Sequence, residues 1–244
     1  MSFPALVGIV EPGDVPGVLQ DLDAVQRAFD GNASGHVDGV CCFNHLYRTI
    51  TSDVWQKVNS PGYFESPEFI SKLDVNFAKR YIDALDAYSS NPISAPRSWQ
   101  VLIDRRSDPR VLEIQFAAAG VNAHVNYDLA FALIATWGQS PGGQVATASQ
   151  HTDFLRINQI FAENMEALRQ SYEGHVARMV DHSILAAANN WVDDLAVVVT
   201  REWAWHHAVE YWRIHEDATE LAERERGLDS LVSLAGRGIL ALVA

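Results

Sequence analysis

RVLEIQFAAAGVNAHVNYDLAFALIATW, residues 110–137, is the most apolar long stretch of the chain. This stretch nevertheless carries five polar side chains that are unusual in an apolar segment: Gln115, Asn122, His124, Asn126 and Asp128. Because a helix turns by about 100° per residue, His124 and Asp128 share one face, and the three amides lie almost opposite them. Buried polar groups are costly unless they are paired. We therefore expect a central, buried helix whose polar groups either bind neighbouring helices or line an internal site.

Helical spacing of apolar residues continues through most of the remaining chain, and no alternating strand pattern or Asn-Gly hairpin occurs. The sequence predicts an all-α, single-domain bundle over residues 1–244, with about seven to nine helices around the central helix 110–137. The other predicted helices cover residues 14–30, 37–58, 66–88, 99–103, 150–174, 175–191, 192–215 and 217–243.

Several helix boundaries have recognisable start or stop residues. Asp14 is expected to cap the first helix, Ser66-Pro67 and Asp108-Pro109 resemble helix starts, and Gly174 is expected to interrupt a helix. A run of small residues, Ala117 to Ala123 with Gly120, leaves little bulk on the central helix. Neighbouring helices can approach closely there.

The composition narrows the classes of partner. The chain has 244 residues, 48% of them hydrophobic, with 31 acidic and 18 basic side chains and a net charge of −13. This balance disfavours nucleic acid and anionic membranes. No run reaches about 18 uninterrupted apolar residues, and the first residues lack a basic leader. With Cys41 and Cys42 as the only cysteines, we expect buried, reduced thiols in a cytoplasmic protein.

His124 and Asp128 are the first candidates for chemistry. Their spacing on one helix lets an imidazole and a carboxylate bind one zinc or iron ion, or lets the carboxylate orient the imidazole as a general base. A buried His–Asp hydrogen bond that only holds helices together is an equally good interpretation.

Three further residues complete the candidate site. His151 is expected in the first turn of a helix capped by Ser149, where the helix dipole favours neutral imidazole. Asp153 is a candidate base, although an acid in a first helical turn is also explained by the dipole. Asp74 is a candidate metal ligand within an apolar helix, or a partner of Arg80. The predicted catalytic residues are thus His124, Asp128, His151 and Asp153, and the predicted metal ligands are His124, Asp128, His151 and Asp74.

Several segments resemble those of a family of functionally uncharacterised bacterial proteins, common in actinobacteria. They are Phe43–Tyr47, Leu73–Ala78, Gln115–Ala117, Asn122–Leu129, His151–Phe154 and Ala235–Gly238. This resemblance implies no particular activity. Locally, Asn122-Ala-His124-x-x-x-Asp128 is similar to a helix of the all-α, zinc-dependent phospholipase C and P1 nuclease superfamily, which implies that His124 and Asp128 bind metal. The chain lacks that superfamily's N-terminal tryptophan ligand and its secretion signal.

Three functions remain open from the sequence. The first is a metal-dependent hydrolase of ester or phosphoester bonds acting on a small-molecule substrate, with zinc or iron activating a water molecule. The second is a metal-free biosynthetic enzyme of the cyclase or isomerase type, in which His and Asp move protons within an apolar aromatic pocket. The third is a non-catalytic protein that binds an apolar ligand.

Overall fold

The computed structural model describes residues 3–30, 37–176 and 197–241. These residues form helices joined by turns and loops, and none of them is in a strand. This confirms the all-α prediction. The chain forms α1 (Val15–Phe29), α2 (Gly39–Val58), α3 (Pro67–Ser90), α4 (Arg97–Arg105), α5 (Glu113–Ala123), α6 (Leu129–Gly138), α7 (Ala148–Val176), α9 (Val197–Trp212) and α10 (Ala218–Ala241).

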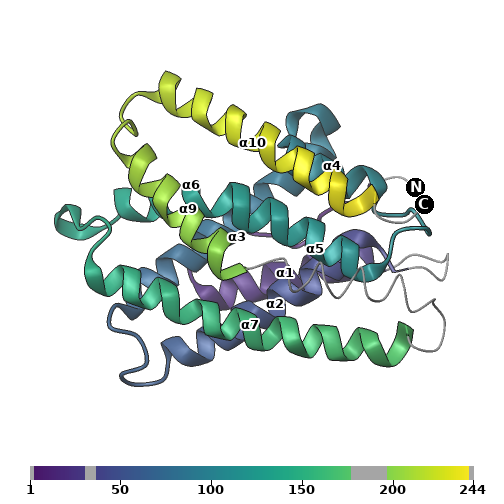
Figure 1. The fold of residues 1–244 in the computed structure, drawn as a ribbon, viewed down its shortest axis with the longest axis horizontal. Helices are drawn as coiled ribbons and strands as arrows, with labels where there is room; N and C mark the ends of the chain where they lie inside the picture. The colour runs from purple at the N-terminus through teal and green to yellow at the C-terminus, as the bar shows by residue number, and fades with distance from the viewer. Residues whose placement is uncertain (1–2, 31–36, 177–196, 242–244) are drawn as a thin grey trace.

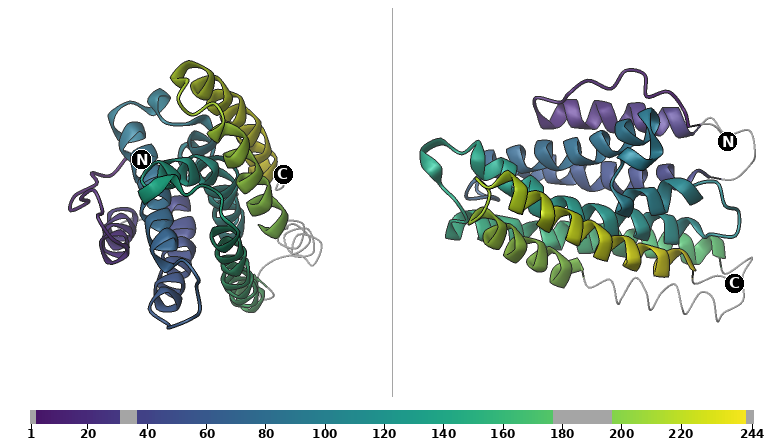
Figure 2. Two further views of the ribbon diagram at one scale, coloured as in Figure 1. Left: turned by 90° about the vertical axis from the view of Figure 1, so that its left-hand side faces the viewer. Right: turned by 90° about the horizontal axis from the view of Figure 1, so that it is seen from above.

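Helices α5 and α6 follow each other through the middle of the bundle, between α10 on one side and α7 on the other (Figure 1). Helix α5 packs on α2, α4 and α10, whereas α6 packs on α3 and α9. Every residue from Ile114 to Ala123 is buried. Helix α1 lies at the outside of the bundle, where it contacts α2 and α3 (Figure 2). The prediction of a central buried helix is confirmed.

A single π-helical turn, His124–Asp128, joins α5 to α6. The N–H of Leu129 donates to the carbonyl of His124, five residues back, in place of the usual four. Such insertions widen a helix locally and are frequent at functional sites. Here the two residues of the predicted His–Asp pair are the first and last residues of the turn.

Two of the three amides opposite that pair bind α10 to the central helix, which is one of the two roles expected for the polar groups of this helix. Gln115 Nε2 donates to the carbonyl of Ile239 at 2.8 Å, and Asn122 Nδ2 donates to the carbonyl of Val232 at 2.9 Å. Asn126 Nδ2 donates to Asn122 Oδ1 at 3.0 Å. Buried amides that are paired in this way avoid the cost of desolvation and fix the register of α10 along α5.

Close approach of α2 and α5 depends on the small residues of the central helix. A Cβ atom placed on Gly120 would overlap the ring of Phe43 on α2. The same relation holds in reverse at Gly39, where a Cβ would lie 2.5 Å from the ring of Phe116 on α5. Each helix therefore offers a glycine to an aromatic ring of the other, and the backbones pack closely.

Some predicted boundaries are wrong. The central helix starts at Glu113, because Asp108–Leu112 form a turn in which Asp108 accepts hydrogen bonds from Arg110. Ser66 does not cap α3 with its side chain. Helix α7 continues through Gly174 to Val176. Asp14 caps α1 as predicted, at 2.8 Å from the N–H of Gly17.

The predicted helix 175–191 lies almost wholly outside the described residues. In the described part of the chain, no helix is both long enough and apolar enough to cross a membrane.

Candidate active site

The π-turn places the imidazole of His124 against the carboxylate of Asp128. His124 Nδ1 lies 3.0 Å from Asp128 Oδ2, and only 2% and 1% of the two side chains are exposed. Trp99 Nε1 donates to the same oxygen at 2.9 Å. Arg80 Nε donates to the other oxygen at 3.1 Å. Both oxygens of Asp128 are therefore occupied by the protein's own donors.

This arrangement fixes the orientation of the histidine. Because Asp128 is a hydrogen-bond acceptor, the proton of a neutral His124 belongs on Nδ1, and Nε2 carries the lone pair. The ring stacks on Phe77, with centroids 3.5 Å apart and an interplanar angle of 6°. Tyr47 packs edge-on against it, with centroids 4.5 Å apart. The imidazole is held on its faces and at one nitrogen, and its other nitrogen is left for a ligand.

His124, whose Nε2 has no partner among the described residues, lines a cavity together with residues of α2, α3, the central helix, α7 and α9. The cavity measures about 50 Å³ when only positions open to the centre of a water molecule are counted. At about 10–15 Å³ per water this corresponds to about four water molecules, so the cavity suits a small ligand. Most of its lining is apolar: Phe43, Leu46, Ile50, Val54, Ile70, Leu73, Phe77, Val121, Val125, Leu129, Ile157 and Phe161.

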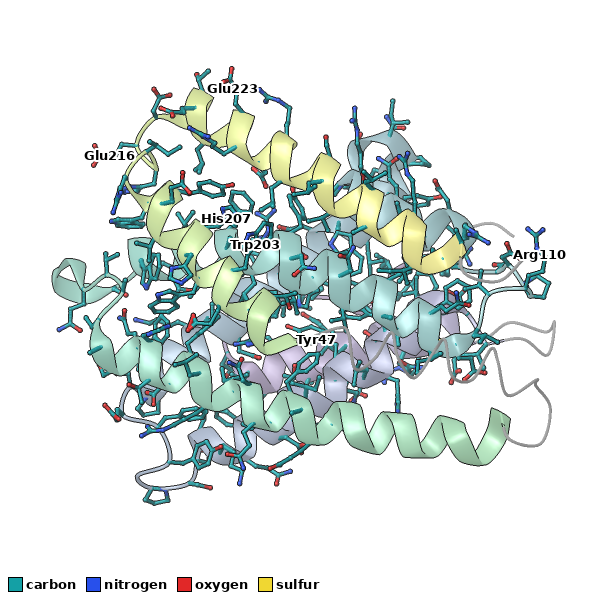
Figure 3. All side chains as sticks on the ribbon, viewed as in Figure 1. Tyr47, Arg110, Trp203, His207, Glu216 and Glu223 are labelled. Carbon is teal, nitrogen blue, oxygen red and sulfur yellow. The ribbon has the colours of Figure 1, made fainter. Side chains whose placement is uncertain are left out.

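Four buried polar atoms of the cavity lining have no hydrogen-bond partner among the described residues. They are Tyr47 Oη, Thr51 Oγ1, Asp74 Oδ2 and His124 Nε2. Buried polar groups in proteins are paired in the great majority of cases, and a group of exceptions in one place needs an explanation. A ligand with complementary polar atoms would supply the missing partners. Figure 3 shows Tyr47 in the interior of the bundle, whereas Glu223 and Arg110 lie at its periphery.

The titratable groups of the cavity have displaced pKa values. Burial lowers the pKa of His124, an effect that the negative charge of Asp128 only partly offsets, and the positive charges of Arg80 and Arg201 lower it further. Burial raises the pKa of Asp74 to about 7. Burial and the charge of Asp74 raise the pKa of Tyr47 well above its usual value, and the neighbouring hydroxyl of Thr51 acts in the opposite direction. At neutral pH the site thus combines a neutral imidazole, a partly protonated carboxyl group and a phenol.

Beyond Asp128, the network reaches α10. Arg80 Nη2 contacts Glu225 Oε1 at 2.7 Å, and Tyr127 Oη donates to the same oxygen at 2.9 Å. Glu225 has 33% of its side chain exposed, so the chain Glu225–Arg80–Asp128–His124 runs from the surface to the cavity. The position of α10 is linked in this way to the carboxylate that orients His124. Arg80 pairs with Asp128. The alternative interpretation of Asp74 as the partner of Arg80 is therefore wrong.

His151 belongs to a different part of the molecule. Its Nε2 lies 3.0 Å from Glu202 Oε1, and its ring packs on Trp205 with centroids 4.7 Å apart. His151 lies in the first turn of a helix, as predicted. The predicted cap is wrong, because α7 already begins at Ala148. The hydroxyl of Thr147, and not that of Ser149, accepts from the N–H of Gln150. The side chain of His151 is 35% exposed and is not part of the cavity lining.

Asp153 has a structural role in the described residues. Its carboxylate accepts hydrogen bonds from the N–H groups of Glu65 and Ser66, at 2.9 and 2.5 Å, just before α3 begins. Arg156 also donates to it at 2.7 Å. Although the side chain is fully buried, its oxygens are used to join α7 to the start of α3. Asp153 thus fixes the two residues that precede α3, whereas Ser66 was expected to cap that helix.

The four predicted metal ligands do not form one coordination shell. The part of the chain that the structure describes contains no group of three or more His, Cys, Asp or Glu side chains that could hold a metal ion. Asp128 is occupied by Arg80, Trp99 and His124. His151 is paired with Glu202, away from the cavity. Only His124 and Asp74 contribute to the same cavity.

Sequence reasoning missed three polar residues of the cavity: Tyr47, Thr51 and Arg201. Tyr47 fits the apolar stripe of its helix, as a core residue would. Thr51 lies four residues further on, so a second polar group on that buried face was the available indication. Arg201 precedes a tryptophan-rich segment, where an arginine is usually a surface residue.

The fold and the site define an all-helical protein with a buried imidazole–carboxylate pair facing a small internal cavity. The chain belongs to a family of unknown function (DUF5995), whose family model matches residues 15–242. No match was found among curated proteins or among solved structures.

Proposed function

We propose that the protein is an enzyme that moves protons within a small, largely apolar molecule bound in the cavity, with chemistry of the isomerase or cyclase type. The observation that supports this most is that four buried polar atoms without a hydrogen bond of normal geometry belong to residues lining one apolar cavity. Sites for small molecules are typically apolar hollows with a few polar groups that orient the ligand. Two of the four groups here, His124 and Asp74, are titratable.

His124 is the general base in this proposal. Burial keeps its imidazole neutral, and the hydrogen bond from Nδ1 to Asp128 leaves the lone pair on Nε2 for a substrate C–H or O–H. Asp74 is the general acid, because a pKa of about 7 leaves much of it protonated at neutral pH. Different environments thus move the pKa values of two groups in the directions that suit opposite tasks.

The proposed reaction needs no co-reactant, because the substrate loses one proton to His124 and gains one from Asp74. Nε2 of His124 accepts a proton from one atom, the electron pair shifts along the substrate, and the proton of Asp74 is added where electron density accumulates. Return of the proton from His124 to Asp74 through the product or solvent restores the starting state. Tyr47 remains protonated and can donate a hydrogen bond to a substrate oxygen that becomes negative, with Thr51 as a second donor.

Metal-dependent hydrolysis has less support, because two of its four predicted ligands are committed elsewhere. A non-catalytic binding protein would use the same cavity, so the decisive test must measure proton transfer and not binding. Incubation in D2O with 2-pentanone, cyclopentanone and 3-pentenoate, followed by NMR, would detect exchange of carbon-bound hydrogen or movement of the double bond. These probes match the size of the cavity.

Wild-type protein is expected to accelerate exchange, and His124→Gln and Asp74→Asn are each expected to lower the rate by at least about 100-fold. His206→Gln on α9 and Asp86→Asn on α3, both at exposed positions, are the matched controls and should retain the wild-type rate. Histidine-selective NMR provides a test independent of the substrate. A proton on Nε2 of His124 at neutral pH would remove the base and contradict the proposal.

A further inference from the structure

Arg201 lies at the wall of the cavity as a deeply buried cation. Its side chain comes from α9, only 3% of the residue is exposed, and it lines the same cavity as His124. Its positive charge is one of the smaller causes that lower the pKa of His124.

Uncharged groups hold the guanidinium of Arg201 in place, and none of these contacts neutralises its charge. Nε donates to Asn158 Oδ1 at 2.7 Å, and the guanidinium carbon lies 4.4 Å from the ring centroid of Phe154. Nη2 approaches the carbonyl of Phe154 at 3.5 Å. No carboxylate of the described residues forms an ion pair with Arg201, and burial lowers its pKa to about 9. Buried charges in proteins are nearly always paired or bound to an ion.

We propose that Arg201 binds the carboxylate of the ligand, so that the cavity takes a short-chain carboxylic acid with its apolar chain among Leu46, Ile50 and Leu73. A guanidinium matches a carboxylate with two parallel hydrogen bonds. One carboxylate balances one guanidinium, whereas a phosphate dianion would leave an uncompensated negative charge in a cavity that also contains Asp74. The inference rests on the proposed function only in assuming that this cavity is the substrate site.

The same geometry predicts a consequence for His124. A bound carboxylate would offset the positive charge of Arg201, which is among the causes of the low pKa of His124. The imidazole would then become a better proton acceptor when the ligand is present. Binding and activation of the base would be coupled through one charge pair.

Isothermal titration calorimetry of the full chain with pentanoate and with pentanamide tests the proposal, because the two probes have nearly the same shape and differ in charge. Pentanoate is expected to bind at least about tenfold more tightly than pentanamide. Histidine NMR should show a rise in the pKa of His124 on addition of pentanoate and none on addition of pentanamide.

Arg201→Met should abolish the preference for pentanoate while pentanamide still binds, and Arg201→Lys should retain part of the preference. Equal or weaker binding of pentanoate by the wild-type protein, or an unchanged pKa of His124 on saturation, would overturn the inference even if Arg201→Met does not fold. The result is distinguishable from failure of the proposed function. A carboxylate preference without any catalysed exchange in D2O would leave the ligand assignment standing and refute the enzyme.

Discussion

Arg80 Nε lies 3.1 Å from Asp128 Oδ1, and through this contact a cation of α3 holds the carboxylate that orients His124. Arg80 also contacts Glu225 on α10 at 2.7 Å. One arginine thus joins three elements that are far apart in the sequence. The two carboxylates differ in burial, since the side chain of Asp128 is 1% exposed and that of Glu225 is 33% exposed.

Asp128→Asn is expected to lower the free energy of unfolding by about 3–5 kcal/mol, because a buried ion pair loses one charge and an amide N–H₂ replaces an oxygen that accepts hydrogen bonds. Urea unfolding followed by circular dichroism measures the loss. Glu225→Gln changes the other partner of the same arginine and should cost less than about 1 kcal/mol, since that pair is partly solvated. Equal losses in the two variants would contradict the importance assigned to the buried carboxylate.

Asp74 is expected to make the protein less stable as the pH rises. Its ordinary pKa of 3.8 is raised to about 7 in the folded state by burial. The folded state therefore favours the protonated form, and the stabilising contribution is complete below about pH 4 and is lost as the pH rises through 7. The loss is up to about 1.4 kcal/mol for each pH unit in that window.

Comparison of wild-type protein with Asp74→Asn from pH 4 to pH 9 isolates this effect. The variant should gain stability relative to wild type between about pH 4 and pH 7, and the gain should then level off. Asp86→Asn, at an exposed position of the same helix, should follow the wild-type curve. A constant difference between Asp74→Asn and wild type over the whole range would show that Asp74 is not desolvated.

His124 is expected to act in the opposite direction. Its pKa is lowered from 6.5, chiefly by burial, so its contribution to stability is present above about pH 6.5 and is lost as the pH falls through that value toward the folded pKa. His124→Gln removes this titration and should flatten the stability curve between pH 7 and pH 5. His206→Gln, exposed on α9, should leave the curve unchanged. Identical curves for wild type and His124→Gln would contradict a buried, neutral imidazole.

Gly120→Ala should destabilise the protein strongly, because a Cβ atom at this position overlaps the ring of Phe43. Since Phe43 also packs on Trp99 and His124, it cannot move away without disturbing the site. We expect a loss of about 1–3 kcal/mol or more, as for other overpacked cores. Gly238→Ala is the matched control: the position is exposed on α10 with nothing near its Cβ, and it should gain about 0.5–1 kcal/mol. A harmless Gly120→Ala would show that α2 and α5 are not in close contact.

The fold was accessible from the sequence because helical periodicity is a local property. The pairing of His124 with Asp128 followed from their spacing of four, and the roles of Gln115 and Asn122 followed from their place on the opposite face. The π-turn could not be predicted, because an i+5 hydrogen bond leaves no mark in the pattern of side chains.

The composition of the cavity was less accessible, since it depends on which helices meet. Asp74 and His124 were identified as unusual polar residues, but only the packing of α3 against the central helix places both at one cavity. Asp153 shows the opposite error. An acid in a first helical turn was expected to serve its own helix or a site, whereas it binds the backbone N–H groups of Glu65 and Ser66, just before α3 and far away in the sequence.

The adjacent cysteines test the packing of α2 without any reference to function. Cys41 and Cys42 are both free and buried, at 1% and 6% exposure, and burial raises the pKa of Cys41 to about 12. Because the thiolate is the reactive form, both thiols should react with Ellman's reagent only through opening of the bundle, at least about 100-fold more slowly than free cysteine at pH 8. In guanidinium chloride both should react at once. Gly120→Ala, which forces α2 away from α5, should accelerate the reaction of the folded protein, whereas the control Gly238→Ala should not. If the native wild-type protein reacted as fast as free cysteine, this face of α2 would not be buried.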